Sequence, residues 1–340
     1  MTGTDCEAFS DIRQRFMALG GVAENVRYGR GPNGRGLFAI DPGRPVRLRV
    51  PRSLLYPTDG LRLDDGKLTL SAQASAGEQE REFFASYQNT MSWARGGRQE
   101  VVAFLQLVGA LPQQARACLV EDFGLGYLLE THDEAAILER FIKARHFDFH
   151  GRAVLMPVLE LCNHSRHGVD FDVGSDHVGV TGRFADGEVL LRYSVADSWQ
   201  RFIQYGFVCE ERAAYSLPME IRLQSGRLAV GHDPAAGRPR NGYLMPHMAV
   251  EGERVTLSHL MLGDRDMPHA PRSVFIAALR EAGIGQPAIL FDRIAHINRS
   301  VFLKLMAAVE DRDGAPATGM RRLARLQLEA LSHAVGAREI

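Results

Sequence analysis

The feature that most constrains the fold is a series of short apolar segments separated by turn sequences near the beginning of the chain. Between Val26 and about Leu70, the segments LFAI, VRLRV, LRL and LTL alternate with PNG, DPGRP, PTDG and DDG. Glycine, proline, asparagine and aspartate in such clusters are typical of turns between strands. The region is therefore predicted to form a small meander of β-hairpins.

A helical pattern follows between about Gln79 and His146. Thr131 and Glu134 have the spacing of a capping box, which marks the start of a helix. Apolar residues then recur on one helical face, at Ile137, Leu138, Phe141 and Ile142.

Strands and loops are predicted again from Val154, where another apolar run begins. From about Pro271 the remainder shows mostly helical periodicity, with residues 313–319, DGAPATG, as a loop between two helices. The order of strands, inserted helices, strands and a mostly helical C-terminal part predicts an α+β fold.

Size and composition limit the partners of the chain. It has 340 residues, 45% of them apolar, which is enough for one large or two smaller domains. The 40 basic and 41 acidic side chains give a net charge of -1, so neither nucleic acid nor a membrane surface is predicted as a partner. No segment approaches the roughly 20 apolar residues of a membrane helix, and no signal peptide pattern is present. We expect a cytoplasmic protein, and the scarcity of lysine among the basic residues favours a bacterial source.

The four cysteines are scattered along the chain, with no CxxC pair and no cysteine and histidine cluster at zinc spacing. Neither a disulfide framework nor a metal site is predicted. Free thiols suit a reducing compartment.

Gly29, Gly31 and Gly34 have the spacing of a dinucleotide-binding turn, but their surroundings do not fit one. Such a turn follows a buried strand and opens a helix, with an acidic residue about 20 positions further on. Here the preceding AENVRY is polar, Gly36 interrupts the following segment, and Asp41 comes too soon. The stretch is predicted to be a hairpin turn, either without a ligand or with exposed backbone groups that hold a ligand bearing a carboxylate and an amine.

A second group of polar residues, Asn163, His164 and Ser165, ends the apolar run that begins at Val154. Alone, this group is more typical of a structural turn than of a site. Cys162 and His164 also suggest a thiol nucleophile with its base, but no third, orienting residue is evident.

Two tyrosines follow about 30 and 42 residues later in the chain. Tyr193 is expected to end an apolar strand, and Tyr205 precedes Gly206 and Phe207 after a short predicted helix. Their structural interpretation is a strand aromatic and a helix-ending turn with glycine near its C-cap.

Taken in order, these pieces resemble the SET-domain methyltransferases, in the branch of RuBisCO large-subunit lysine methyltransferase and actin-histidine methyltransferase. The match extends over roughly residues 20 to 210. The segments that carry the resemblance are GRGLFA (34–39), VRLRVPRSLL (46–55), KARHF (143–147), MPVLELCNHS (156–165), GEVLLRY (187–193) and QYGFV (204–208).

The resemblance implies a SET-domain β-fold of small sheets of short strands, with a helical insert and a mostly helical C-terminal domain. The implied parts are 1–75 for the N-terminal part of the SET domain, 76–146 for the helical insert, 147–215 for the C-terminal part of the SET domain, and 216–340 for a domain like the family's substrate-binding domain.

The resemblance also implies S-adenosylmethionine as cofactor and S-adenosylhomocysteine as product. Backbone groups of the glycine-rich segment would hold the methionine moiety, Asn163 would contact its amino acid end, and the backbone at His164 would contact the adenine. The residues of that glycine-rich segment are Gly34, Arg35, Gly36, Leu37 and Phe38.

Four further residues receive roles by resemblance. Arg145 matches an arginine that can pair with the cofactor carboxylate, a task that a planar guanidinium suits, although a solvated arginine in the last turn of a helix would also occupy this position. Glu160 stands where the family commonly has aspartate. Tyr193 matches the tyrosine regarded as catalytic, and Tyr205 matches a position that lines the methyl-transfer channel.

The match departs from the family after Tyr193. The family commonly reads Tyr-Gly-x-x-Ser-Asn-x-Glu, whereas this chain has Ser194, Asp197, Ser198 and Gln200 at the corresponding places. These changes are expected to loosen the turn behind Tyr193.

Three classes of function remain open on the sequence. The first is methyl transfer to a lysine, or less readily a histidine, of a protein substrate. The second is methyl transfer to a small-molecule amine or amino acid in a biosynthetic pathway, and the third is a SET fold without catalysis that serves as a binding module.

Overall fold

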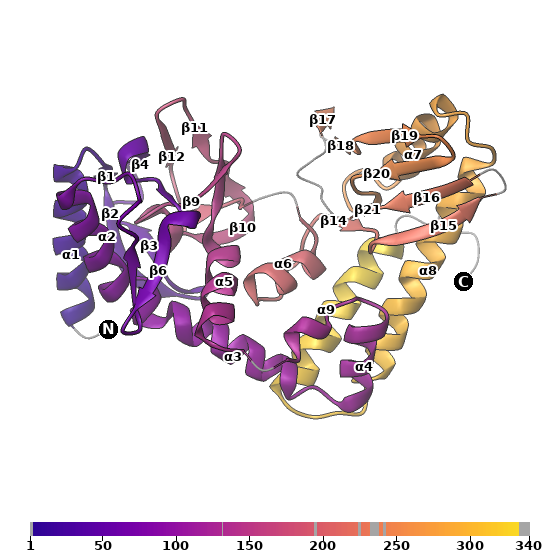
Figure 1. The fold of residues 1–340 in the computed structure, drawn as a ribbon, viewed down its shortest axis with the longest axis horizontal. Helices are drawn as coiled ribbons and strands as arrows, with labels where there is room; N and C mark the ends of the chain where they lie inside the picture. The colour runs from indigo at the N-terminus through magenta and orange to yellow at the C-terminus, as the bar shows by residue number, and fades with distance from the viewer. Residues whose placement is uncertain are drawn as a thin grey trace. The chain divides into compact units, whose positions relative to one another are not determined.

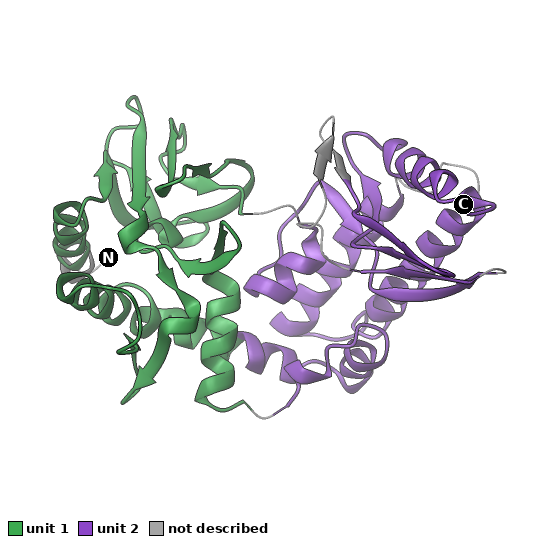
Figure 2. Ribbon diagram, turned by 45° about the horizontal axis from the view of Figure 1, so that its top comes forward, with its two compact units in different colours: residues 1–103, 132–193 green, residues 104–131, 194–340 purple. Residues whose placement is uncertain are grey.

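The structure is a computed structural model of the 340-residue chain. It describes residues 3–130, 132–193, 196–223, 226–231, 238–240 and 243–332. The chain divides into two compact units, coloured separately in Figure 2. Unit 1 comprises residues 1–103 and 132–193, and unit 2 comprises residues 104–131 and 194–340.

Unit 1 combines several small sheets with helices, as Figure 1 shows. Its strands are β1 (Val22–Glu24), β2 (Val26–Gly31), β3 (Gly34–Ala39), β4 (Val46–Pro51), β5 (Tyr56–Pro57), β6 (Leu61–Asp64), β7 (Lys67–Leu70), β8 (Phe147–Phe149), β9 (Arg152–Leu155), β10 (Asn163–Val169), β11 (Asp172–Val173), β12 (His177–Gly182) and β13 (Leu190–Leu191). Its helices are α1 (Gly3–Ala18), η1 (Arg52–Leu54), η2 (Thr58–Gly60), α2 (Glu78–Thr90), the π-helical turn η3 (Trp93–Gly97), the start of α3 (Arg98–Gly109), α5 (Glu134–Arg145) and η5 (Leu159–Leu161).

The predicted strands before Leu70 are confirmed, but their pairing is not a continuous meander. β2 pairs with β3, and β6 pairs with β7, as hairpins. β4 instead lies between β1 and β12, in a four-stranded sheet ordered β1-β4-β12-β11. The turn sequence before β4 therefore separates it from β3, and its partner β12 comes from more than a hundred residues later in the chain.

Aromatic side chains form much of the core of unit 1. Phe83 and Tyr87, on one face of α2, are fully buried, with ring centroids 6.1 Å apart. Tyr56 contacts Phe84 edge to face at 4.7 Å, and its hydroxyl donates to the carbonyl of Glu80. These contacts fasten α2 to the strands of the unit.

The helical pattern between Gln79 and His146 is confirmed by α2, α3, α4 (Gln113–Glu121) and α5. The predicted capping box at the start of α5 is corrected. Asp133 is the N-cap, and its side chain accepts a hydrogen bond from the Ala136 N–H, while Thr131 lies outside the described residues. The boundary between the two units falls inside α3, so the predicted insert 76–146 contributes to both units.

Unit 2 is also a mixture of helices and strands. Its helices are the remainder of α3, then α4, η4 (Gly126–Leu128), α6 (Ser198–Tyr205), α7 (Ala270–Glu281), α8 (Pro287–Ala307) and α9 (Ala315–Ser332). Its strands are β14 (Ala213–Tyr215), β15 (Met219–Leu223), β16 (Gly226–Val230), β17 (Arg238–Arg240), β18 (Tyr243–Met245), β19 (Met248–Glu251), β20 (Arg254–Leu257) and β21 (Met261–Asp264).

The helices predicted from about Pro271 are confirmed by α7, α8 and α9, although α9 begins at Ala315, inside the predicted loop 313–319. The strands between Ala213 and Asp264 were not assigned by the sequence analysis. β15, β16, β20 and β19 form one sheet, in which β16 and β20 are parallel. The predicted α+β class is confirmed, and unit 2 contributes a sheet as well as helices.

The core of unit 2 joins its helices to this sheet. One buried cluster includes aromatic side chains from three helices, namely Trp199 and Phe202 of α6, Phe275 of α7, and Phe291 and Phe302 of α8.

No helix among the described residues combines the length and apolar character needed to span a bilayer.

The residues that depart from the family after Tyr193 have a definite local role. Asp197 is the N-cap of α6, and it forms a capping box in which its side chain accepts from the Gln200 N–H and the Gln200 side chain accepts in return. Ser198 Oγ accepts from the Glu211 N–H at 3.3 Å. Asp197, Ser198 and Gln200 therefore stabilise the start of α6. Ser194 lies outside the described residues, and the expected loosening of the turn behind Tyr193 stays a prediction.

Candidate functional site

The glycine-rich segment forms a two-stranded antiparallel hairpin, here called the glycine hairpin, from β2 and β3. Pro32 and Asn33 form its turn, and Gly34 follows with φ 91°, a conformation that glycine adopts without strain. The segment around Glu188 lies beside β3, since the Ala39 N–H donates to Gly187 O and the Val189 N–H donates to Leu37 O. No helix follows the glycines, which agrees with the rejection of a dinucleotide-binding turn.

Asn163 is joined directly to the glycine hairpin. Its Nδ2 donates to the carbonyl of Arg35 at 2.9 Å and to Glu188 Oε1 at 2.8 Å. A β-carbon at Gly36 would lie 2.6 Å from this nitrogen, so the close approach requires glycine there. Because both partners are acceptors, the amide orientation is fixed, and Oδ1 receives no hydrogen bond from any described residue.

Glu188 is a residue of this site that the sequence analysis missed. It is only 5% exposed, and its two oxygens accept from two different amides, Asn163 Nδ2 and Asn33 Nδ2 at 3.0 Å. A buried carboxylate needs such donors, because an unpaired charge is costly in the interior. Glu188 is part of the GEVLLRY motif, so an acidic residue in an otherwise apolar strand was the available signal.

The side chains of Leu37 and Phe38 belong to the core and are at most 8% exposed. Their predicted backbone contacts with a cofactor stay a prediction, and the Leu37 carbonyl is already paired with the Val189 N–H. Gly34 is exposed, and Gly36 is buried against Asn163.

Arg35 and Arg145 meet at one carboxylate, that of Glu100. Arg35 Nη2 donates to Glu100 Oε1 at 2.6 Å, and Arg145 Nη2 donates to Glu100 Oε2 at 2.8 Å. The Arg145 guanidinium also lies 4.9 Å from the centroid of the Phe141 ring. Arg145 is only 21% exposed, so it is not the fully solvated arginine of the alternative interpretation. The buried Nε–H of Arg145 donates to no acceptor within the described residues.

Glu160 lies in a neighbouring buried cluster. Its Oε1 accepts from Ser92 Oγ at 2.6 Å and from the Tyr87 hydroxyl at 3.0 Å. Burial raises the pKa of Glu160 above its ordinary value, although the charge of Arg145 and the two hydrogen bonds favour the ionised form. In the part of the chain that the structure describes, Glu160 Oε2 is buried without a hydrogen-bonding partner.

Tyr193 and His164 contact each other. The Tyr193 N–H donates to His164 Nδ1 at 3.3 Å, and the two rings are 5.2 Å apart. The Tyr193 hydroxyl donates to the carbonyl of Cys162. Tyr193 follows β13 by two residues instead of ending the strand, which corrects the expectation from the sequence.

The alternative of a cysteine nucleophile does not fit the surroundings of Cys162. The side chain is 1% exposed, and burial together with the charge of Glu188 raises the pKa of its thiol well above the ordinary value. Since the thiolate is the reactive form, this thiol is inert near neutral pH.

Tyr205 belongs to unit 2, where it is the last residue of α6. Gly206 follows with φ 80° as a left-handed C-cap, which confirms the helix-ending turn. The Arg201 guanidinium lies 5.6 Å from the centroid of the Tyr205 ring, and Phe207 stacks on it at 5.7 Å. The role of Tyr205 in a methyl-transfer channel stays a prediction.

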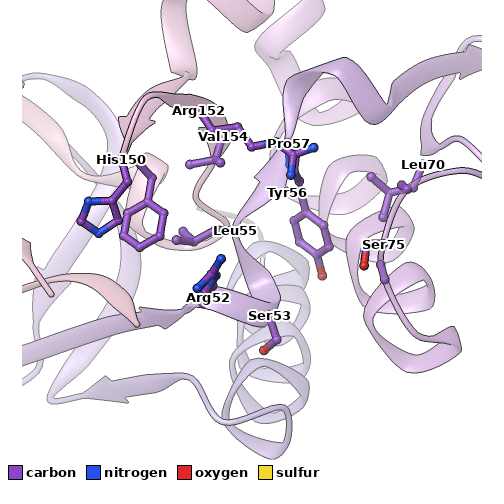
Figure 3. Close-up of a pocket in the computed structure, with 13 residues that line it drawn as sticks. Arg52, Ser53, Leu55, Tyr56, Pro57, Leu70, Ser75, His150, Arg152 and Val154 are labelled. Carbon is purple, nitrogen blue, oxygen red and sulfur yellow. The ribbon is translucent and has the colours of Figure 1, made fainter. Parts of the chain in front are cut away.

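A separate pocket of about 710 Å³ lies elsewhere in unit 1, between η1, β5, β9 and the turn after β8. In Figure 3, Arg52 lies between His150 and Tyr56, with Leu55 beside it. Arg152, which also lines the pocket, pairs with Asp59 at 3.3 Å. None of the predicted site residues lines this pocket.

Comparisons with known proteins add a distant structural similarity. No family model matches the chain, and no curated protein matches it. Among solved structures, the chain is similar to a crystal structure of the SET domain of LSMT bound to lysine and AdoHcy, with 14% sequence identity and a TM-score of 0.42. The similarity covers 97% of this chain and 90% of that one. At this identity and score, the function of the chain has to be inferred from its own residues.

Proposed function

We propose that the chain is an S-adenosylmethionine-dependent N-methyltransferase of the SET type. The observation that carries the proposal is the hydrogen bond from Asn163 to the Arg35 carbonyl, which joins two segments 128 residues apart. The resemblance in the sequence assigns these same two segments to one cofactor pocket. A glycine-rich hairpin with no shared site is not expected to contact the segment that contains Asn163 and His164.

The residues around this contact fit the amino acid end of such a cofactor, which carries an ammonium and a carboxylate. Asn163 Oδ1 and Glu160 Oε2 are acceptors that the described protein groups leave open, and they suit an ammonium. Arg145 Nε is an open donor of the type that a carboxylate requires. Buried polar atoms without partners are rare in native proteins, so Glu160 Oε2 and Arg145 Nε, an acceptor and a donor, support a polar ligand.

S-adenosylmethionine supplies, when bound, a methyl group on a positively charged sulfur. A lysine substrate with an ordinary pKa of about 10.4 must be presented neutral, which costs about 4.6 kcal/mol at pH 7. A positive charge about 5 Å away, at an effective dielectric constant of about 20, disfavours the protonated amine by about 3.3 kcal/mol. Desolvation of the amine adds to this, so a strong general base is not required.

Tyr193 is proposed to orient the substrate amine. Its hydroxyl proton is engaged by the Cys162 carbonyl, so toward an amine the oxygen acts as an acceptor. An acceptor in a fixed position can direct the nitrogen lone pair toward the methyl group, and such orientation lowers the barrier. Contact between this tyrosine and His164 holds the ring in place.

The proposed acceptor of the methyl group is a lysine side chain of a protein, or less readily a histidine. The proposal also retains the predicted backbone contacts of His164 with the adenine and the predicted place of Tyr205 beside the methyl-transfer channel. The sequence departs from the family in residues 216–340, the part that presents the substrate in that branch, so the protein substrate is expected to differ from those of the named enzymes.

The test is a labelling experiment with methyl-labelled S-adenosylmethionine and a cell lysate, preceded by a calorimetric measurement of cofactor affinity. Label in the macromolecular fraction, together with release of S-adenosylhomocysteine, is the expected result. Label confined to small molecules would reassign the substrate to a free amine or amino acid. Failure to bind the cofactor at millimolar concentration would remove the proposed activity altogether.

A further inference from the structure

The side chain of Arg35 forms hydrogen bonds with a segment outside the glycine hairpin. Its Nη1 donates to the carbonyl of Arg95, and its Nη2 donates to Glu100 Oε1. Tyr28, from the opposite strand of the glycine hairpin, lies close enough to interact electrostatically with the guanidinium. The guanidinium is therefore held at once by the hairpin and by the segment from Trp93 to Glu100.

The backbone of that segment is shaped to receive the guanidinium. Gly96 has φ 141°, within the π-helical turn η3. A β-carbon there would lie 2.1 Å from Arg35 Nη2 and 2.7 Å from the central guanidinium carbon. Only glycine allows both this conformation and this approach, so the Arg35 guanidinium lies close against the backbone at Gly96.

Glu100 extends the contact to a third element. While Oε1 accepts from Arg35, Oε2 accepts from Arg145 at the end of α5. The two arginine side chains are only 23% and 21% exposed, whereas the Glu100 side chain that they share is 56% exposed. Solvent screens such a carboxylate, so the contact depends on the two half-buried arginines more than on the strength of each ion pair.

The main chain of Arg35 completes the connection. Its carbonyl accepts from Asn163 Nδ2, so one residue contacts Asn163 through its backbone and the helical insert through its side chain. Arg35 is therefore fixed to two different segments, one through its main chain and one through its side chain.

We infer that Arg35 is a positioning residue, whose side chain locks the helical segment 93–100 to the glycine hairpin and thereby sets the geometry of the cofactor site. Arg35, Gly96 and Glu100 together are called the arginine latch. The inference rests on the proposed function for its effect on the cofactor, and it assigns to the Arg35 side chain no contact with the cofactor itself.

The test compares Arg35→Gln with Arg98→Gln. Arg98 is a control because it also pairs with a glutamate, Glu134, which belongs to α5 and not to the hairpin. The Arg98 side chain is 39% exposed, against 23% for Arg35. The two readouts are the affinity for S-adenosylmethionine by calorimetry and hydrogen exchange of the backbone amides in residues 93–100.

Arg35→Gln is expected to weaken cofactor binding at least tenfold and to increase exchange across residues 93–100. Arg98→Gln should change the affinity less than twofold and increase exchange in residues 93–97 less than Arg35→Gln does. Arg35→Lys should recover part of the affinity, because an ammonium can reach Glu100 or the Arg95 carbonyl but cannot bridge both in the same fork. Glu100→Gln should weaken binding less than Arg35→Gln, and the double variant should be no worse than Arg35→Gln alone.

Wild-type affinity in a folded Arg35→Gln variant would overturn the inference, as would equal exchange in the two variants. If the wild-type chain fails to bind the cofactor, the proposed function fails, and hydrogen exchange alone decides whether the latch exists. If Arg35→Gln does not fold, Arg35→Lys, which keeps the charge, takes its place. A partial loss of affinity in Arg35→Lys supports the inference, and wild-type affinity contradicts it.

Discussion

Two asparagines, one in each unit, show how the same side chain serves two purposes. Asn298, in α8 of unit 2, is fully buried and uses its whole amide. Nδ2 donates to Ser216 Oγ at 3.1 Å and to Ile294 O at 2.9 Å, and Oδ1 accepts from the Leu217 N–H at 2.8 Å. Asn163 uses both donors in the same way, but its oxygen accepts from no described residue.

The difference separates a structural amide from one suited to recognition. A fully satisfied buried amide stabilises a single arrangement of the segments around it. An amide whose donors are fixed by Arg35 and Glu188, and whose acceptor is left open, presents that acceptor in one direction. This preorganisation allows Asn163 to bind a donor without first losing rotamer freedom.

The largest effect is expected for Asn298→Ala. The substitution leaves the Leu217 N–H without its partner in a buried position and removes three hydrogen bonds, so the free energy of unfolding should fall by about 3 kcal/mol. Urea denaturation measures the change. If Asn298→Ala and Asn163→Ala destabilise the protein equally, the distinction between the two asparagines is lost.

Asn163→Ala should mainly affect the ligand. We expect the affinity for S-adenosylmethionine to fall by about 10- to 100-fold, or about 1.4 to 2.7 kcal/mol, measured by calorimetry. Asn33→Ala is the matched control, because Asn33 donates to the other oxygen of Glu188. Its effect on affinity should stay below about threefold, and an equal loss in both variants would mean that only the position of Glu188 matters.

Tyr193→Phe tests the step after binding. It removes the hydroxyl that is proposed to orient the amine but keeps the ring against His164. Turnover should fall at least about tenfold, equivalent to about 1.4 kcal/mol of barrier, while cofactor affinity stays near normal. Unchanged turnover in a methylation assay would remove Tyr193 from the proposed mechanism.

The smallest effect concerns the pH dependence of Glu160. Because burial raises its pKa in the folded state, the folded protein holds this proton more tightly than the unfolded chain does. Stability therefore decreases as pH rises from the unfolded value through the raised folded pKa, and it is higher below that window. Glu160→Gln should flatten this part of the curve, as measured by thermal unfolding at a series of pH values. A slope identical to wild type would show that Glu160 does not titrate there.

The sequence by itself determined the local features of this protein. Pro32, Asn33 and Gly34 define a tight turn whatever surrounds them, and helical periodicity depends on neighbours three and four residues apart. Gly206 was recognised as a helix-ending glycine for the same reason. In each case the signal and the structure lie within a few residues of each other.

Only the tertiary structure decided which side chains meet. The Arg35 carbonyl lies 128 residues before its partner Asn163, and the Arg35 side chain pairs with Glu100, 65 residues later. The paired residues of β4 and β12 lie 126 to 136 positions apart in the chain. Glu100 gives no local sign of its role, and an apolar motif around Glu188 marks that residue only as unusual, because a carboxylate acquires its role from the donors that folding brings to it. Turns and helices depend on short-range backbone geometry, whereas the candidate site depends on hydrogen bonds between distant segments, and periodicity contains no information about those.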